Sequence, residues 1–251
     1  MEIVTVPCLS DNYAYLVKGP EGVCLIDAPE AAPIIAALEA RGWGLDTLLI
    51  THRHHDHVEG VAALRGKYGC TVLGPAAEAD KLPPLDTAVE GGAALTVSGL
   101  RLEVIAVPGH TLGHVAFYMP EAEAVFTADS LMALGCGRVF EGTPDMMWDS
   151  LSRLAALPPQ TMVYSGHEYT ASNARFALTI EPGNEALKLR ADAIAKARAE
   201  GQPTAACMLS EELATNPFLR PDSPEIRDLL GMEGASAAEV FTEIRARKDR
   251  F

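Results

Sequence analysis

The stretch Thr51-His52-Arg53-His54-His55-Asp56-His57 places four histidines and one aspartate within six consecutive residues. Residues 45–50, just before it, are rich in leucine and isoleucine and predict a buried strand. Residues 58–65, just after it, carry apolar side chains at helical spacing and predict a helix. The cluster therefore lies on a loop between the end of a strand and the start of a helix, where α/β sheets place their ligand sites.

This loop offers metal ligands in two pairs. Alternate residues of an extended segment share a face, so His52 and His54 can reach one point. Asp56 and His57 follow after a turn and point elsewhere, which suggests two adjacent metal ions. Imidazole and carboxylate ligands together suit zinc, iron or manganese. The alternative is an exposed polar loop in which Asp56 caps the helix, and His55 by itself is better explained as such a surface residue.

Three more ligand-type residues follow strand ends. His110, Asp129 and His167 come two or three residues after strands predicted at residues 100–107, 124–127 and 162–165. His114 lies four residues after His110, but the segment that follows it predicts a strand. We therefore expect His114 in the core or behind a ligand rather than on a metal.

The donors divide into two sets with a possible bridge. We expect one three-nitrogen site and one mixed site, formed by His52, His54 and His110 and by Asp56, His57 and His167. Asp129 is a lone carboxylate after an apolar strand and suits a bridge between the two ions. The alternative for Asp129 is a plain turn at residues 128–130.

Length, composition and charge limit the classes of function. The chain has 251 residues, enough for one large domain or a large and a small one. Its 48% hydrophobic and 22% charged residues are ordinary for a globular protein. The formal net charge of -14 argues against nonspecific nucleic-acid binding.

The N-terminus and the cysteines indicate the compartment. Residues 1–7 have no basic segment and no long apolar run, so they are not expected to be a signal peptide. No later segment has the length of a membrane span. The five cysteines are scattered without CxxC spacing, which predicts free, buried thiols in a reducing cytosol. We expect a cytoplasmic monomer that binds neither nucleic acid nor membrane.

The pattern of elements changes near residue 170. Strands dominate the chain up to His167, and helices are predicted afterwards at residues 171–179, 184–200 and 237–248. This change predicts a catalytic domain at residues 1–169 and a helical domain at residues 170–251.

The ligand series resembles that of the metallo-β-lactamase superfamily. The matching pieces are Thr51-His52-x-His54-x-Asp56-His57, Gly109-His110-Thr111-x-Gly113-His114, Phe126-Thr127-Ala128-Asp129 and Gly166-His167. Further pieces resemble the glyoxalase II (hydroxyacylglutathione hydrolase) branch: Ser10-Asp11-Asn12-Tyr13, Gly135-Cys136-Gly137-Arg138, Glu141-Gly142-Thr143, Tyr164 to Thr170, Thr215-Asn216-Pro217-Phe218 and Arg245-x-x-Lys248-Asp249. These pieces run along nearly the whole chain.

The resemblance implies a fold and a reaction. The implied fold is α+β, an αββα metallo-β-lactamase sandwich with a small C-terminal all-helical domain. The implied reaction is hydrolysis of S-D-lactoylglutathione to D-lactate and glutathione, the second step of methylglyoxal detoxification. A hydroxide that bridges two divalent ions, zinc being expected and iron or manganese being alternatives, would attack the thioester. No catalytic residue beyond the metal ligands is expected, because a thiolate with a reference pKa of about 8.5 leaves without a strong acid.

The resemblance also implies a glutathione-binding set. Arg245 and Lys248, three residues apart on a helix face, would bind the glycine carboxylate, and Arg138 and Tyr169 would line the pocket. Without the resemblance, the basic tail would be a favourable positive end of a helix. Arg138 replaces a lysine that the branch often has, and Phe140 replaces a tyrosine that bonds glutathione in some members.

Three further functions fit parts of the pattern. A glutathione persulfide dioxygenase with one iron uses the same fold and ligand motif, but the helical C-terminal segment argues against it. The second is a hydrolase of lactones or β-lactams, and the third is a metal-binding protein without activity. Metal-dependent thioesterase turnover would separate the hydrolase from the dioxygenase.

Overall fold

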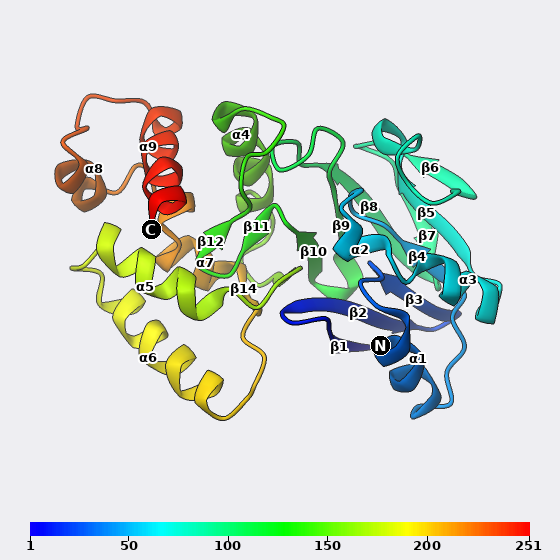
Figure 1. The fold of residues 1–251 in the computed structure, drawn as a ribbon. Coiled ribbons are helices and arrows are strands. Elements are labelled where there is room, and N and C mark those ends of the chain that lie inside the picture. Colours follow the sequence, from blue (N-terminus) through cyan, green and yellow to red (C-terminus); the bar gives the residue numbers. More distant parts are fainter. The chain divides into compact units, whose positions relative to one another are not determined.

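The computed structural model describes residues 1–251 of the protein. Figure 1 shows the elements, which are in chain order β1 (Glu2–Cys8), β2 (Asn12–Gly19), β3 (Gly22–Ile26), α1 (Ala31–Glu39), β4 (Thr47–Leu49), α2 (His55–Val58), α3 (Val61–Tyr68), β5 (Thr71–Pro75), η1 (Ala76–Glu78), β6 (Thr87–Val89), β7 (Ala94–Val97), β8 (Leu100–Ala106), β9 (Val115–Met119), η2 (Pro120–Ala122), β10 (Ala124–Ala128), β11 (Leu131–Met132), β12 (Gly135–Cys136), α4 (Pro144–Ala155), β13 (Met162–Ser165), α5 (Thr170–Ile180), α6 (Glu185–Ala199), β14 (Ala206–Met208), α7 (Leu209–Thr215), η3 (Pro217–Leu219), α8 (Pro224–Leu230) and α9 (Ala237–Arg250).

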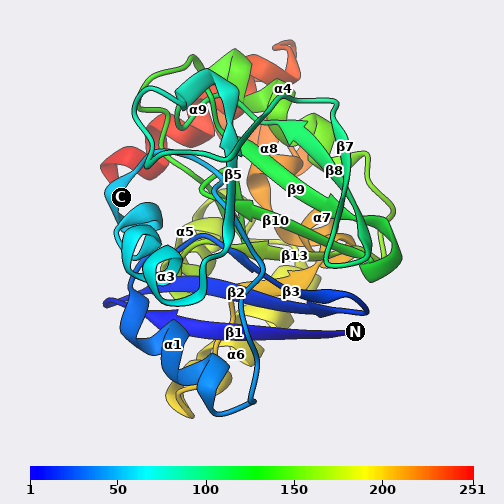
Figure 2. The same ribbon diagram turned by 90° about the vertical axis from the view of Figure 1, so that its right-hand side faces the viewer.

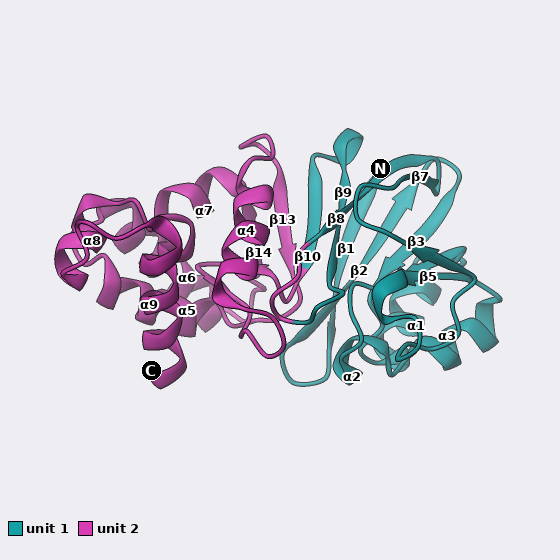
Figure 3. Ribbon diagram, turned by 90° about the horizontal axis from the view of Figure 1, so that it is seen from above, with its two compact units in different colours: residues 1–106, 111–127 teal, residues 107–110, 128–251 magenta.

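Two compact units divide the chain. Unit 1 comprises residues 1–106 and 111–127, and unit 2 comprises residues 107–110 and 128–251 (Figure 3). The predicted boundary between residues 169 and 170, which rests on the change from strands to helices in the sequence, stays a prediction.

The first sheet, in unit 1, brings the key loop to one edge. Its strand order is β1-β2-β3-β4-β5-β6, with β1 to β3 antiparallel and β3 to β6 parallel. Ile26 at the end of β3 pairs with Leu49 at the end of β4. Parallel strands end at the same edge, so Asp27 and Thr51, just beyond these ends, lie side by side.

Two layers cover this sheet within unit 1. Side chains alternate between the two faces of a sheet along a strand, so two neighbouring residues of β2 contact the two layers that pack on the opposite faces of this sheet. Leu16 packs in an apolar cluster with Leu38 of α1 and Leu64 of α3. Tyr15 contacts Phe126 of β10, with ring centroids 5.6 Å apart. Figure 2 shows α1 and β10 on opposite sides of β2, so unit 1 stacks helices, a sheet and a second layer of strands, β7 to β10.

The segment beyond residue 170 is helical except for the three-residue strand β14. The predicted helices at residues 171–179, 184–200 and 237–248 correspond to α5, α6 and α9. With the family described below, this arrangement confirms the predicted fold class.

The helix predicted at residues 58–65 has different bounds. A one-turn helix, α2, ends at Val58, and α3 begins only at Val61. Gly60 lies between them, where an added Cβ would come within 2.9 Å of the backbone nitrogen of Ala31. The close approach of two backbones therefore interrupts the helix, which sequence periodicity does not reveal.

Several elements carry no prediction from the sequence. Residues 144–155 form α4, whose start has ordinary signals: the Thr143 hydroxyl accepts a hydrogen bond from the backbone N–H of Met146, and Pro144 occupies the first turn. The short elements α7, α8, β6 and β14 were also absent from the prediction, because three to seven residues carry little periodicity.

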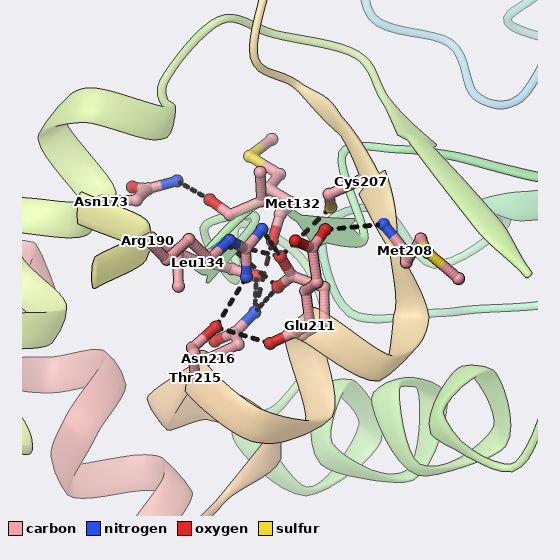
Figure 4. A network of polar contacts seen from close by, with 12 residues as sticks. Met132, Leu134, Asn173, Arg190, Cys207, Met208, Glu211, Thr215 and Asn216 are labelled. Atoms are coloured by element: carbon pink, nitrogen blue, oxygen red, sulfur yellow. Dashed lines mark hydrogen bonds and ion pairs between the residues drawn. The ribbon is translucent and has the colours of Figure 1, made fainter. Parts of the chain in front are cut away.

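A buried polar network in unit 2 is centred on Glu212, and Figure 4 labels its partners Leu134, Arg190, Cys207 and Asn216. Its fully buried carboxylate accepts hydrogen bonds from the Leu134 backbone N–H at 3.0 Å and the Asn216 amide at 2.7 Å. It also pairs with the Arg190 guanidinium and accepts from the Cys207 thiol at 3.2 Å. Because each polar group is satisfied, the network can lie in the interior without a large desolvation cost.

We expect Glu212→Ala to lower the free energy of unfolding by about 3–5 kcal/mol, because it leaves a buried guanidinium without its partner. Urea denaturation measures the loss. The control is Glu185→Ala, which breaks an exposed ion pair with Lys188 and should cost about 1 kcal/mol or less. Equal losses in the two variants would contradict the role of the network; if Glu212→Ala does not fold, Glu212→Gln allows the same comparison.

Candidate metal centre

In unit 1, His52 and His54 direct nitrogen atoms at one point. His52 Nε2 lies 3.1 Å from His54 Nδ1. Two donors that each lie about 2.1 Å from one tetrahedral ion are about 3.4 Å apart. His52 is fully buried, and its Nδ1 lies 3.0 Å from the Thr51 hydroxyl, which leaves Nε2 as the outward donor. The pair therefore has the spacing that a metal ion requires.

His57 is oriented by a buried carboxylate. Its Nδ1 lies 2.8 Å from Asp27 Oδ2, and Asp27 also accepts from the backbone N–H and the hydroxyl of Thr51, both at 2.8 Å. With Nδ1 donating to Asp27, the lone pair of Nε2 is available to a metal. Asp56 Oδ2 lies 3.8 Å from that Nε2, so Asp56 and His57 form a second donor pair.

Asp27 is a residue of this site to which the sequence assigned no role. Its signal is an acidic residue directly after an apolar strand, next to the strand that precedes the histidines. Its φ of 56° lies in the left-handed region, which few residues other than glycine, asparagine and aspartate adopt. Such a backbone state is consistent with a position fixed by its hydrogen bonds.

Two more polar residues brace the same loop. The Asn12 amide donates to Asp56 Oδ2 and to the Asp56 backbone oxygen, both at 3.0 Å. Glu78 accepts from the backbone N–H groups of Arg53 at 2.7 Å and Gly113 at 3.1 Å. The hydrogen bonds of Glu78 could not be predicted from the sequence, because they depend on the position of η1 beside the loop.

The other two histidines of unit 1 take different positions. His114 is buried and stacks on His52, with ring centroids 4.5 Å apart. This position agrees with the expected place in the core, behind a ligand. The His55 side chain is 80% exposed and lies 3.3 Å from Glu59, as expected for a surface residue.

In unit 2, Asp129 lies between two histidines. Its Oδ2 is 3.3 Å from His110 Nε2, and its Oδ1 is 3.3 Å from His167 Nε2. His110 Nδ1 is 2.8 Å from the backbone oxygen of Arg138, which leaves Nε2 to face the carboxylate. An added Cβ at Gly137 would lie 1.9 Å from the backbone oxygen of Asp129, so this turn requires glycine. Each carboxylate oxygen thus faces a different imidazole, the arrangement of a bridging ligand.

The donor chemistry fits a divalent metal. Within unit 1, the ligand atoms of His52 and His57, and of Asp56 and His57, lie within 4.8 Å of each other. Neutral imidazoles and carboxylates are ligands that zinc, iron and manganese accept. The protein therefore has groups of histidine and aspartate side chains that could bind metal.

Arg138 and Arg245 share one carboxylate in unit 2. Arg245 Nη2 lies 2.8 Å and Arg138 Nε lies 3.8 Å from Asp249 Oδ1. Arg245 is buried, donates to the Cys136 backbone oxygen at 2.9 Å and covers the Phe218 ring. Arg138 is 65% exposed. Arg138 is therefore open to a ligand, whereas Arg245 is engaged within the protein.

Lys248 and Tyr169 flank α5. Lys248 Nζ lies 3.5 Å from the Ser172 backbone oxygen and 5.1 Å from the centre of the Phe176 ring. Burial and the charges of nearby arginines lower the pKa of Lys248 to about 8. Tyr169 stacks on His167, with ring centroids 4.8 Å apart, so it lies directly beside a metal-type ligand.

The cysteines offer no nucleophile. All five are free and buried, as predicted. Cys136 lies in the two-residue strand β12. Burial raises the pKa of the Cys136 thiol, so the thiolate that attacks carbonyl groups is not formed at neutral pH.

No helix combines the length and apolar composition needed to cross a bilayer.

We expect Asp27→Asn to weaken metal binding about 10- to 100-fold, because His57 loses the carboxylate that orients its ring. Asparagine tolerates the backbone conformation of Asp27, so the fold should persist. Competition with a fluorescent zinc chelator measures the affinity. The control is Asp149→Asn, at an exposed position of α4, which should leave affinity unchanged. Unchanged affinity in Asp27→Asn would show that the carboxylate serves the fold alone.

Family models match the chain along nearly its whole length. The metallo-beta-lactamase superfamily model matches residues 10–167, and the model of the hydroxyacylglutathione hydrolase C-terminus matches residues 168–251. The two matches meet at His167, the last of the predicted ligands.

Curated and solved relatives cover most or all of the chain. The hydroxyacylglutathione hydrolase of Ruegeria pomeroyi is 62% identical over 253 residues, covering 100% of this chain and 99% of the relative. The solved structure of ETHE1 from Myxococcus xanthus is 24% identical with a TM-score of 0.68, covers 99% and 98% of the two chains, and shows the fold. TTHA1623 in a di-iron-bound form is 30% identical with a TM-score of 0.62, covering 87% and 100%. The chain therefore belongs to the hydroxyacylglutathione hydrolase family of the metallo-β-lactamase superfamily.

Proposed function

We propose that the protein is a metal-dependent thioesterase that hydrolyses S-(2-hydroxyacyl)glutathione to a 2-hydroxy acid and glutathione. The proposed substrate is S-D-lactoylglutathione, and the proposed role is the second step of methylglyoxal detoxification in the cytoplasm. The observation that carries the proposal is the pair of family matches over residues 10–167 and 168–251. Full-length relatives named hydroxyacylglutathione hydrolase favour this reaction over the persulfide dioxygenase.

Two divalent metal ions are the proposed cofactor, zinc first, with iron or manganese accepted by the same ligands. The proposed ligands are His52, His54 and His110 for one ion, Asp56, His57 and His167 for the other, and Asp129 as the bridge. The 3.1 Å separation of the His52 and His54 nitrogen atoms supports an ion shared by these two residues. The two carboxylate oxygens of Asp129 face His110 and His167, which supports a bridge between the two ions. A relative at 30% identity was solved in a di-iron-bound form.

The chemistry requires little beyond ligands and positioning. When bound, the two ions would lower the pKa of a water molecule and polarise the thioester carbonyl. The side chains of Asp27, Asn12 and Glu78 hold the loop that carries four of the seven proposed ligands. The departing thiolate has a reference pKa of about 8.5, so no dedicated acid is needed.

The proposed substrate-binding residues are Arg138, Tyr169, Arg245 and Lys248. The exposed guanidinium of Arg138 and the ammonium group of Lys248 supply the positive charge that a glutathione carboxylate needs in a chain of net charge -14. Arg245 is proposed to bind the glycine carboxylate together with Lys248, and its guanidinium also donates to the Cys136 backbone oxygen and to Asp249. Residues 1–169 would then act as the catalytic domain and residues 170–251 as the substrate-binding domain of a monomer.

We expect the purified protein to hydrolyse S-D-lactoylglutathione, with about two metal ions per chain. Loss of thioester absorbance follows turnover, and elemental analysis of the same sample counts the metal. His110→Ala should lower kcat at least about 100-fold, because it removes a proposed ligand. Cys136→Ala should retain kcat, since the buried thiol is not a nucleophile.

Two results would contradict this function. Absence of turnover with two metals bound would leave the fold and exclude the thioesterase. Oxygen consumption with glutathione persulfide and one bound iron would assign the dioxygenase instead.

The KM for the thioester should rise as pH increases through about 8, while kcat changes little. The pKa of Lys248 is lowered to about 8, first by burial and then by Arg245 and Arg175, so its charge is present below this pH and lost above it. Lys248→Arg keeps the charge at all these pH values and should give a flat KM up to pH 9. Initial rates corrected for spontaneous hydrolysis measure both profiles. An identical rise in the arginine variant would exclude Lys248 as its source.

A further inference from the structure

The turn directly before His110 in unit 2 packs on α4. Gly109 lies against Met147 of this helix, where an added Cβ would come within 2.9 Å of the Met147 Cβ. The φ of Gly109 is 148°, in the region that favours glycine. The backbone N–H of Gly142, just before α4, donates to the Gly109 oxygen at 3.1 Å. The backbone that leads into His110 is therefore held against α4 and the segment before it.

Ser150 of α4 adds a side-chain contact to the same turn. Its hydroxyl is fully buried and lies 2.7 Å from the Pro108 oxygen and 2.9 Å from the Met146 oxygen. A hydroxyl has only one proton to donate. In the α-helical pattern, the Met146 oxygen accepts the backbone N–H of Ser150. Pro108 lies outside the helices and strands, so its oxygen depends more on the hydroxyl.

The ring of His110 makes two short contacts that depend on its backbone. Its Nδ1 lies 2.8 Å from the Arg138 backbone oxygen, and its Nε2 lies 3.3 Å from Asp129 Oδ2. Both nitrogen atoms belong to one rigid ring, so a small displacement of the His110 backbone would lengthen at least one of these contacts. The turn before His110 therefore controls where Nε2, the proposed metal donor, lies.

We propose that Ser150 is a positioning residue for the metal centre, which holds the turn at residues 108–109 so that His110 directs Nε2 at its ion. The hydroxyl acts through the Pro108 backbone rather than on the ion or the substrate. Groups that orient a metal ligand typically contribute about 10- to 100-fold to metal affinity or activity. This inference rests on the proposed function, since it concerns one of the proposed ligands.

The same helix offers a matched control. Ser152 Oγ donates to the Trp148 backbone oxygen at 2.8 Å, and Ser150 makes the equivalent contact with Met146, four residues back. Ser150 in addition reaches the turn at residues 108–109. Ser152→Ala therefore removes the contact within the helix alone, whereas Ser150→Ala also removes the contact with the turn.

Zinc affinity tests the proposal without turnover. Ser150→Ala should weaken the binding of one of the two zinc ions about tenfold, measured by competition with a fluorescent chelator. With S-D-lactoylglutathione, the same variant should lower kcat about tenfold with KM unchanged, because the proposed substrate contacts are unaltered. Ser152→Ala should leave both zinc affinities, kcat and KM unchanged. Ser150→Thr keeps the hydroxyl and should restore the zinc affinity.

The ring N–H of His110 gives a spectroscopic readout. In the zinc-loaded protein labelled with ¹⁵N-histidine, the Nδ1–H resonance of His110 is the one that disappears in His110→Ala. Its exchange with water should become severalfold faster in Ser150→Ala, because the hydrogen bond to the Arg138 oxygen is weakened. The exchange should stay slow in Ser152→Ala.

Unchanged zinc affinity in Ser150→Ala, or an equal loss in Ser152→Ala, would overturn the assignment. A Ser150→Thr variant that unfolds at the same urea concentration as the unsubstituted protein and still binds zinc as weakly as Ser150→Ala would also overturn it. If Ser150→Ala does not fold, Ser150→Cys replaces it, since a thiol has a similar shape and is a weaker donor.

Failure of the unsubstituted protein to bind two zinc ions would contradict the proposed metal centre itself. Normal zinc binding and turnover in the unsubstituted protein, together with an unaffected Ser150→Ala variant, would overturn only this inference.

Discussion

The buried carboxylate of Asp27 fixes the loop on which the proposed chemistry depends. It receives three hydrogen bonds, from the backbone and hydroxyl of Thr51 and from His57. Burying a carboxylate is costly unless hydrogen bonds compensate for the lost water. The buried position of Asp27 therefore depends on its hydrogen bonds with Thr51 and His57. The two parallel strands β3 and β4 make this possible, because they end at one edge and deliver both groups there. These hydrogen bonds therefore connect both ends of the histidine loop to the end of β3.

In unit 2, side chains donate hydrogen bonds to the backbone carbonyl groups of a short hairpin. Residues 131–136 form β11 and β12, and their backbone oxygens accept from Asn173 at 3.0 Å, Asn216 at 3.0 Å and Arg245 at 2.9 Å. This hairpin connects Asp129 to Arg138, the proposed bridge to a proposed substrate contact. The helices of the C-terminal segment therefore do more than present cations. They set the shape of the chain immediately after Asp129.

The sequence predicted the fold class well, because the fold class depends on local signals, whereas the proposed donor residues stay a prediction. Apolar strands followed by histidine or aspartate identify a ligand edge without knowledge of the distant contacts, and both family matches agree with the predicted fold class. Contacts between distant residues were not predictable in the same way. Gly60 interrupts a helix because of a neighbouring backbone, and Glu78 braces the loop from a separate turn. The pairing of Arg245 with Cys136 depends on how α9 packs, although its spacing from Lys248 suggested a shared role.

The burial of every cysteine has a consequence for a protein whose proposed product is itself a thiol. Glutathione and its disulfide exchange with protein cysteines through the thiolate form, at a rate that depends on access and on ionisation. Burial raises the pKa of Cys8 and Cys24 to about 12 and raises that of Cys207 well above its ordinary value. Such thiols are neither exposed nor ionised at neutral pH. We therefore expect these buried thiols to react slowly with glutathione disulfide.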